Sequence, residues 1–368
     1  MTAQIGLATA LRPYFARGRT NPAMMFFMQA AAAPSSGPIP ADLPPALCIL
    51  GLGLIGGSLA RAMHDRLPVV GWSPSEETRA AAAADGFDVA DTLDSALGRA
   101  VQQDALVVLA SPVTTFRGLL GSIDELAPKV RLTDVASVKA VVQDQVANLA
   151  PQARYIGSHP MAGTANSGWP AGSPGLFDRA AWVTCLTEDS NADDWAAVAS
   201  VALAVGSRVV PAEPQAHDAA VARISHLPHI LALALAQVGE QGGALALSLA
   251  ASSFADATRV AGTRPALIRA MCETNRDALV DALDDALGII GVARGSLAST
   301  GSLDKITKGG HLARSNFDHR ADDLRSVTLD GEELIDQLLA VGMAGGHVSG
   351  FERIGSELAI KAWYPDQE

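Results

Sequence analysis

A single glycine-rich stretch near residue 50 constrains the fold of this chain more than any other feature. An apolar run over residues 46–50 leads directly into the pattern G-x-G-x-x-G over residues 51–56, and a helical pattern follows at once. A strand, a glycine turn and a helix in that order are typical of a dinucleotide-binding site. An ordinary strand–helix turn is the alternative, but the flanks on both sides favour the nucleotide site.

Each glycine of this pattern has a defined task in such a site. Gly51 would make the tight turn, Gly53 would let the backbone approach a pyrophosphate, and Gly56 would let the helix lie close to the strand. The helix begins at Leu54 and Ile55, where free backbone N–H groups face the anion. These five residues are therefore predicted to bind a nicotinamide cofactor.

The composition indicates a globular protein and excludes several other classes. The chain has 368 residues, 49% of them hydrophobic, which suggests two domains. Its 27 basic and 39 acidic residues give a net charge of −12 without a basic cluster, so nucleic acid is not an expected partner. Apolar runs such as Leu231–Ala236 fall short of the ~20 residues that a membrane span needs, so no membrane contact is expected.

The cysteines favour a reducing compartment. Cys48, Cys185 and Cys272 stand far apart, with no C-x-x-C pair. This pattern predicts reduced, structural thiols in a cytoplasmic protein. No cluster of histidine and cysteine has the spacing of metal ligands, so a metal site is not expected either.

Residues 1–45 precede the folded part and are predicted to form a disordered leader. The stretch 22–34 resembles the apolar region of a signal peptide. A plain disordered leader, or a translation start at Met24, Met25 or Met28, is the alternative. We favour these alternatives because a cofactor-dependent enzyme belongs in the cytoplasm.

Short apolar strands alternate with amphipathic helices between residues 46 and 214. This alternation predicts an α/β domain of the Rossmann type, with a doubly wound parallel sheet that carries helices on both faces. The predicted strands are 46–50, 69–72, 105–110, 130–135, 182–186 and 209–210.

Beyond Pro214 the pattern changes to helices rich in alanine and leucine. Residues 215–300 are predicted to form an all-helical substrate and dimerisation domain. The apolar helix over 230–251 would pack against a second copy, and an internal core helix is the alternative. Residues 301–368 are predicted to form a small C-terminal α/β extension, with a strand from Val327, a helix and a further strand.

Polar residues follow three strand-like runs of the sequence. Ser111 and Pro112 follow one run, Ser137 another, and His159 a third. Ligands of doubly wound sheets bind outside the carboxyl ends of the strands, so these residues should meet over the nicotinamide. An ordinary loop histidine is the alternative at His159.

The helical region carries two further candidate clusters. His217 precedes His226 and His229, which are three residues apart at a predicted helix start and can face one cleft. Arg259 and Arg264 stand in an otherwise apolar region, where a guanidinium suits a carboxylate ligand. An ion pair of Arg259 with a neighbouring aspartate is the alternative.

Taken together, these motifs resemble the prephenate/arogenate dehydrogenase family of tyrosine biosynthesis, and most of all its actinobacterial branch. The matching pieces follow the family's order over residues 46–300: GLGLIGGSLA, DVASVK, GSHPMAGT, SHLPH and DATRVAG. The resemblance implies oxidative decarboxylation of prephenate to 4-hydroxyphenylpyruvate with hydride transfer to NAD(P)+. It also implies an active site between the two domains, and we expect a homodimer.

The resemblance implies a role for each site residue. Hydride leaves C4 of prephenate, CO2 departs, and His159 accepts the proton of the C4 hydroxyl. Ser137 would bridge that hydroxyl and the nicotinamide, and Arg259 would bind a substrate carboxylate. Around the same pocket the resemblance places His229, with His217 and His226 in support.

Position 73 departs from the pattern of NAD-specific members. Those usually carry an acidic residue after the second strand, which binds the ribose 2′-hydroxyl. Ser73 stands there instead, so NADP+ is not repelled, and Arg79 is near enough to reach a 2′-phosphate. NAD+ and NADP+ both remain open, and we favour dual use or NADP+.

Position 264 bears on the choice between prephenate and arogenate. Relatives that prefer arogenate often place a carboxylate near this point, where this chain has Arg264. An arginine would oppose the ammonium group of arogenate and assist the pyruvyl carboxylate of prephenate. Prephenate is therefore the favoured substrate, and a solvent-facing Arg264 that selects nothing is the alternative.

Two other functions share this layout. A β-hydroxyacid dehydrogenase would need a lysine in the helical domain, and none lies between His217 and Arg259. A non-catalytic NAD(P)H sensor would use the same fold without needing His159 and Ser137 together with Arg259.

Overall fold

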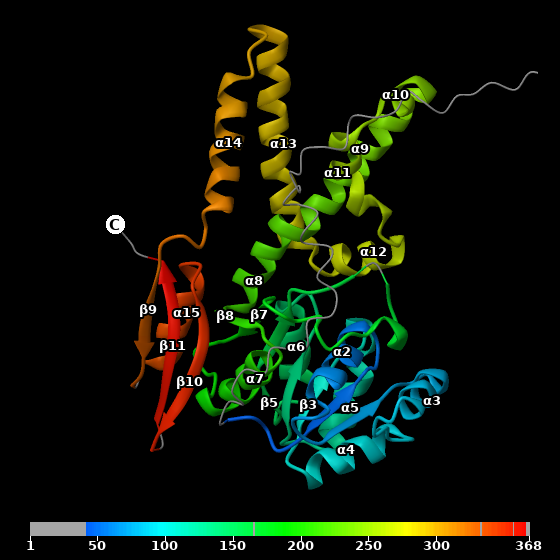
Figure 1. The fold of residues 1–368 in the computed structure, drawn as a ribbon, viewed down its shortest axis with the longest axis vertical. Helices are drawn as coiled ribbons and strands as arrows, with labels where there is room; N and C mark the ends of the chain where they lie inside the picture. Colours follow the sequence, from blue (N-terminus) through cyan, green and yellow to red (C-terminus); the bar gives the residue numbers. More distant parts are fainter. Residues whose placement is uncertain (1–41, 165, 332, 356, 366–368) are drawn as a thin grey trace, which may run out of the picture.

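The computed structural model describes residues 42–365 apart from positions 165, 332 and 356 (Figure 1). The predicted leader over residues 1–45 therefore lies outside the described residues, except for its last four. Among those four, Asp42 forms an ion pair with Arg353 at 2.5 Å, and Pro44 is buried.

The first sheet is parallel, with the strand order β2-β1-β3-β4-β5. Val89 adds a parallel bridge beside Gly71 of β2, which completes the order of a Rossmann sheet. The order reverses between β1 and β3, and ligands of such sheets bind at this switch point. The predicted Rossmann-type sheet is confirmed, but the predicted strands 182–186 and 209–210 belong to a second sheet. Its strands are β1 (Leu47–Leu50), β2 (Val69–Trp72), β3 (Leu106–Leu109), β4 (Arg131–Asp134) and β5 (Arg154–Tyr155).

Helices cover both faces of this sheet because each central strand is apolar on both sides. In β1, Leu47 and Ile49 belong to one buried cluster, while Cys48 and Leu50 belong to the other. This alternation follows from the two-residue period of a strand. The helices are α2 (Leu54–Met63), α3 (Glu76–Ala84), α4 (Leu93–Gln102), α5 (Phe116–Leu126) and α6 (Ala140–Leu149).

A second sheet has the order β6-β7-β8-β10-β11-β9. Its strands are β6 (Gly157–Pro160), β7 (Ala181–Cys185), β8 (Arg208–Ala212), β9 (Leu324–Leu329), β10 (His347–Ile354) and β11 (Glu357–Pro365). β7 and β8 are parallel and joined by α7 (Ala192–Ala204), but β6 runs antiparallel to β7, which the strand pattern did not predict. Antiparallel neighbours need no crossover helix, and among the described residues between β6 and β7 the one helical element is a short 3₁₀ turn, Trp169–Ala171.

The C-terminal α/β extension is present and continues this second sheet. Val348 of β10 pairs with Val209 of β8. The helix α15 (Leu334–Met343) packs so closely on β8 that a Cβ on Gly342 would lie 1.6 Å from the carbonyl oxygen of Pro211. Two strands follow α15, where the sequence predicted one.

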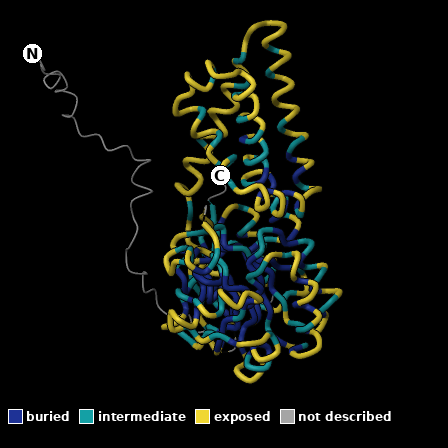
Figure 2. The backbone as a smooth tube through the Cα atoms, turned by 90° about the vertical axis from the view of Figure 1, so that its right-hand side faces the viewer, coloured by how far each residue is buried: buried dark blue, intermediate teal, exposed yellow. Residues whose placement is uncertain are grey.

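Between the two parts of the second sheet, residues 214–318 are largely helical. The helical region was predicted over 215–300, and α14 (Asp304–Asp318) extends it into the segment that was predicted as the α/β extension. These helices rise above the sheets in Figure 1, and Figure 2 shows that most of this half is exposed while the buried residues gather below. Its own core is small, comprising Ala222, Ile268, Cys272, Leu279 and Ala282. The helices are α8 (Pro214–Val221), a π-helical turn (Ala222–His226), α9 (Leu227–Gln241), α10 (Gly243–Leu249), α11 (Ser252–Thr258), α12 (Pro265–Thr274), α13 (Arg276–Ser299) and α14 (Asp304–Asp318).

One continuous helical segment, Pro214–Gln241, runs through α8, the π-helical turn and α9. By length and composition alone it is long and apolar enough to cross a membrane. Only 22% of its most apolar window is buried within the chain. This exposed apolar surface has to be covered in any stable assembly of the protein.

Candidate active site

The glycine turn after β1 has the geometry of a dinucleotide site. Gly51 has φ of 120°, and a Cβ there would lie 2.6 Å from the backbone of Ala110 and Ser111. A Cβ on Gly56 would lie 1.9 Å from the carbonyl oxygen of Gly51. The turn, the end of β3 and the start of α2 are therefore packed backbone to backbone, which only glycine permits.

The second glycine of the pattern, Gly53, has open space beside it. No atom of the described chain lies within 4 Å of a Cβ built on Gly53, which precedes the first turn of α2 at Leu54 and Ile55. That helix has no side-chain cap and no acidic residue in its first turn, so its N–H groups can receive an anion. These residues fit the pyrophosphate of a dinucleotide.

The loop after β2, where the adenosine ribose of such a cofactor binds, has no carboxylate at position 73. Ser73 is buried, and its hydroxyl accepts a hydrogen bond from the backbone of Ser75 at 3.3 Å. Arg79 donates to the carbonyl oxygens of Ser73 and Pro74, at 2.7 and 3.3 Å. A guanidinium thus lies directly against this loop.

Ser111 and Pro112 follow β3 at the switch point. The Ser111 hydroxyl lies 2.7 Å from the hydroxyl of Thr115, and Pro112 is exposed. Because the backbone of Ser111 adjoins Gly51, the two loops line the same edge of the sheet.

The loop after β4 carries Ser137 and is fixed by a buried ion pair. The ammonium of Lys139 donates to the carboxylate of Asp134, and both side chains are fully buried. Lys139 also donates to the carbonyl oxygen of Ser158 at 2.7 Å, and the Tyr155 hydroxyl donates to Asp134 at 2.6 Å. Burial and the Asp134 charge raise the pKa of Tyr155 well above its ordinary value. The loop that presents Ser137 is thereby held to β6.

His159, on β6, begins a chain of three side chains. Its Nδ1 lies 2.9 Å from Nε2 of His217, and Nδ1 of His217 lies 2.8 Å from the carboxylate of Asp218. His217 and Asp218 belong to α8, so this contact joins the helical region to the strand that carries His159.

Asp218 is a site residue that the sequence analysis missed. Its carboxylate accepts the backbone N–H groups of Lys139 and Ala140, at 2.8 and 2.9 Å, where α6 begins. One carboxylate therefore fixes both His217 and the loop that carries Ser137. Its position directly after His217 was the only signal in the sequence.

The environment of His159 and His217 disfavours their protonated forms. Burial, followed by the positive potential of His217 and Lys139, lowers the pKa of His159 well below 6.5. Burial also lowers the pKa of His217, against the opposing effect of its hydrogen bond to Asp218. Although burial raises the pKa of Asp218, hydrogen bonds from His217 and the α6 backbone outweigh it and leave that pKa lowered.

The other two predicted histidines lie on the π-helical turn and on α9. His226 is fully buried, with Nδ1 3.2 Å from the amide nitrogen of Asn275, and burial lowers its pKa to about 4. Its Nε2 has no hydrogen-bond partner among the described residues. His229 is partly buried, with Nδ1 2.8 Å from the carbonyl oxygen of Ser225. Asn275 also donates to the carbonyl oxygen of Asp218 at 2.8 Å. No pattern in the sequence predicts this contact.

The two arginines of the helical region that were predicted as site residues are exposed. Arg259 begins a short 3₁₀ turn, and Arg264 immediately precedes α12. No ion pair joins Arg259 to Asp256 in the described part of the chain. Both guanidinium groups are thus accessible to an anionic ligand.

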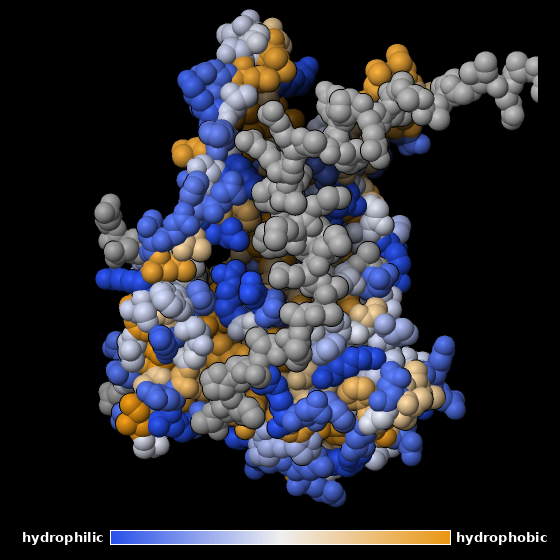
Figure 3. Space-filling view, in the orientation of Figure 1, coloured by the Kyte–Doolittle hydropathy of each residue, from blue (hydrophilic) through white to orange (hydrophobic). Residues whose placement is uncertain are grey.

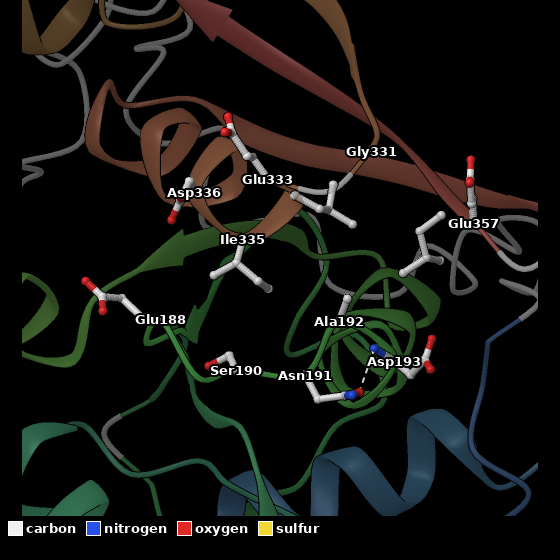
Figure 4. A pocket seen from close by; sticks show the side chains of 12 residues that line it. Glu188, Ser190, Asn191, Ala192, Asp193, Gly331, Glu333, Ile335, Asp336 and Glu357 are labelled. Carbon is white, nitrogen blue, oxygen red and sulfur yellow. Dashed lines mark hydrogen bonds between the residues drawn. The ribbon is translucent and has the colours of Figure 1, made fainter.

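A pocket of about 600 Å³ lies elsewhere, between the start of α7 and the start of α15 (Figure 4). None of the predicted site residues lines it. Its wall is rich in carboxylates, including Glu188, Asp193, Glu333, Asp336 and Glu357. It is therefore separate from the histidine cluster.

Two family models match the chain. The model described as "Prephenate dehydrogenase, nucleotide-binding domain" matches residues 56–211, and "Prephenate dehydrogenase, dimerization domain" matches residues 213–297. The prephenate dehydrogenase of Bacillus subtilis is 33% identical over 253 residues, which cover 65% of this chain and 66% of that protein, just under two thirds of its length. The cyclohexadienyl dehydrogenase of Zymomonas mobilis is 31% identical over 266 residues, which cover 69% of this chain and 88% of that protein.

Solved structures agree with these matches. A candidate prephenate dehydrogenase from Corynebacterium glutamicum is 48% identical, with a TM-score of 0.73 over 76% of this chain and 90% of that one. The arogenate dehydrogenase of Synechocystis is 29% identical, with a TM-score of 0.65 over 74% of this chain and 99% of that one. Both halves of the active-site region lie inside the matched residues. The chain belongs to the prephenate dehydrogenase family.

Proposed function

We propose that this protein is an NAD(P)+-dependent prephenate dehydrogenase, which converts prephenate to 4-hydroxyphenylpyruvate and CO2. The observation that carries the proposal is the series His159–His217–Asp218, placed beside the Ser137 loop. It supplies a neutral base where the two halves of the site meet. Arogenate, the substrate named for the Synechocystis relative, is the alternative.

The hydrogen-bond directions determine which nitrogen of His159 is free. The Asp218 carboxylate can only accept, so Nδ1 of His217 carries the proton and donates. Neutral His217 then has an unprotonated Nε2, which accepts the Nδ1–H of His159. Nε2 of His159 is left with a lone pair, ready to accept a proton from a substrate hydroxyl.

That lone pair suits the proposed reaction. Bound NAD(P)+ supplies the hydride acceptor for C4 of the substrate. As negative charge leaves C4, its hydroxyl becomes acidic, and Nε2 of His159 takes the proton. Ser137, presented by the fixed loop after β4, would hold the same hydroxyl in place. Loss of CO2 then makes the ring aromatic.

The substrate carboxylates need positive partners in an otherwise acidic chain. We assign Arg259 to one carboxylate, since it is exposed and not paired with Asp256. Arg264 would favour the pyruvyl side chain of prephenate over the ammonium of arogenate. His226 and His229 would support the same side of the pocket.

The helical region also supports a homodimer. The matched dimerization domain covers α8 to α13, and many of its apolar side chains are exposed within one chain. A second copy covers such a surface without the cost of placing His217, Asp218 and His226 of the Pro214–Gln241 helix in lipid. We accordingly propose a cytoplasmic homodimer.

The proposal is tested by NAD(P)H formation at 340 nm with purified protein, crossing prephenate and arogenate against NAD+ and NADP+. We expect activity with prephenate to exceed that with arogenate. Higher kcat/KM with arogenate would replace the substrate assignment and keep the mechanism. Silence in all four combinations by protein that still binds cofactor would instead support the sensor.

The cofactor preference rests on Ser73 and Arg79. We expect Ser73→Asp to raise KM for NADP+ by roughly tenfold or more, because a carboxylate there repels the 2′-phosphate and accepts the 2′-hydroxyl of NAD+. The measurement is kcat/KM for both cofactors, with Ser75→Asp as the control on the same loop. An unchanged ratio in Ser73→Asp would place the ribose away from this loop.

A further inference from the structure

Residues 286–293 of α13 carry no polar or charged side chain. Leu287, Ile289, Ile290 and Val292 lie within six consecutive positions, and each is between 51% and 61% exposed. At about 100° per residue they point in four different directions around the helix. A helix that is apolar all round is normally enclosed by other helices. The described residues of one chain do not enclose it, and Figure 3 shows apolar surface near the upper ends of α13 and α10.

The next helix, α14, is also unpartnered. It follows a short turn at 300–303 and runs back along α13 (Figure 1). None of its residues is buried. Within the described chain, the side-chain hydrogen bonds and ion pairs of this helix stay within residues 302–320, as in Lys308–Asp304 and Arg314–Asp318.

Nevertheless α14 has an apolar stripe. Ile306, Gly310, Ala313 and Phe317 are spaced by four, three and four residues, so they fall within about 60° of one another around the helix. The Arg320 guanidinium lies 4.1 Å over the Phe317 ring, yet Phe317 is still 53% exposed. The small residues at 310 and 313 would allow another helix to approach closely.

We propose that α14 packs through this stripe on the helical domain of a second copy of the chain, and so extends the dimer interface beyond α13. The inference rests on the proposed homodimer. The matched dimerization domain ends at residue 297 and α14 begins at residue 304, so the stripe continues an interface that already ends beside it. The partner offers a suitable surface in the exposed leucines and valine of α9 and α10: Leu235, Val238, Leu245 and Leu249.

The test is the dissociation constant of the full-length dimer, measured by sedimentation equilibrium. We expect the double variant Ile306→Glu/Phe317→Glu to raise it by roughly tenfold or more. Leu312→Glu is the matched control, because Leu312 is 62% exposed but lies more than about 100° from the stripe. Ile290→Glu, in the core of the interface, should give monomer.

The outcomes separate the two proposals. A wild-type protein that stays monomeric would overturn the homodimer and with it this inference. A wild-type dimer that the double variant leaves unchanged would overturn only the role of α14.

A second measurement does not depend on how glutamate affects folding. Phe317→Cys, labelled with a thiol-reactive photocrosslinker, should give a covalent dimer on illumination, and Leu312→Cys should give little. The three native cysteines are buried, which limits background labelling. Crosslinks from position 317 that form only within one chain would contradict the proposal.

Discussion

His159→Asn should lower kcat by roughly 10²–10⁴-fold, the usual contribution of a general base, while KM for prephenate changes little. Asparagine retains a hydrogen-bonding side chain at position 159, and its amide can still contact Nε2 of His217. It has no basic nitrogen that can take the proton of the C4 hydroxyl. The expected loss therefore falls on the transition state rather than on binding.

The control for this variant is His311→Asn, an exposed histidine on α14 whose replacement should leave kcat unchanged. A His159→Asn enzyme with near-normal turnover would remove His159 from the reaction. If KM rose instead while kcat held, His159 would be a binding residue.

The same assignment fixes the direction of the pH profile. A lowered histidine pKa means that the neutral form persists below pH 6.5, so kcat/KM should fall only as the pH drops through that lowered pKa. Stability should follow the same direction. The unfolded chain protonates these histidines near pH 6.5 while the folded chain does not, so stability is complete above pH 6.5 and declines below it.

The nucleotide-binding half of this fold was readable from the sequence because its determinants are local. A strand such as β1 shows its burial on both faces in four consecutive apolar residues, and the glycine pattern follows directly. Ser137 lies after a strand, as predicted, because β4 ends at Asp134, but His159 lies within β6 and not after a strand.

The links between distant segments were not readable. Asp218 bonds to the backbone of Lys139 across 79 positions of the chain, and the sequence records no trace of that pairing. The antiparallel direction of β6 and the pairing of β10 with β8 depend in the same way on long-range contacts. Local pattern indicates which residues are buried or reactive, but not which partner they meet.

Lys139 illustrates this difference, and its replacement should have the largest effect on stability. We expect Lys139→Met to lower the free energy of unfolding by roughly 3–5 kcal/mol, because it leaves the fully buried Asp134 carboxylate without its counter-charge. The hydrogen bonds from Tyr155 and the Ala136 backbone remain, but neither supplies a positive charge. The measurement is urea unfolding followed by circular dichroism.

Two further variants show whether the charge is the cause. Lys308→Met, at an exposed ion pair of α14, should cost no more than about 0.5 kcal/mol. Adding Asp134→Asn to Lys139→Met removes the unpaired charge, so the double variant should be more stable than Lys139→Met alone. A double variant that is equally unstable would show that Lys139 acts through packing and its bond to Ser158. In either case the Ser137 loop loses an anchor, so activity should fall together with stability.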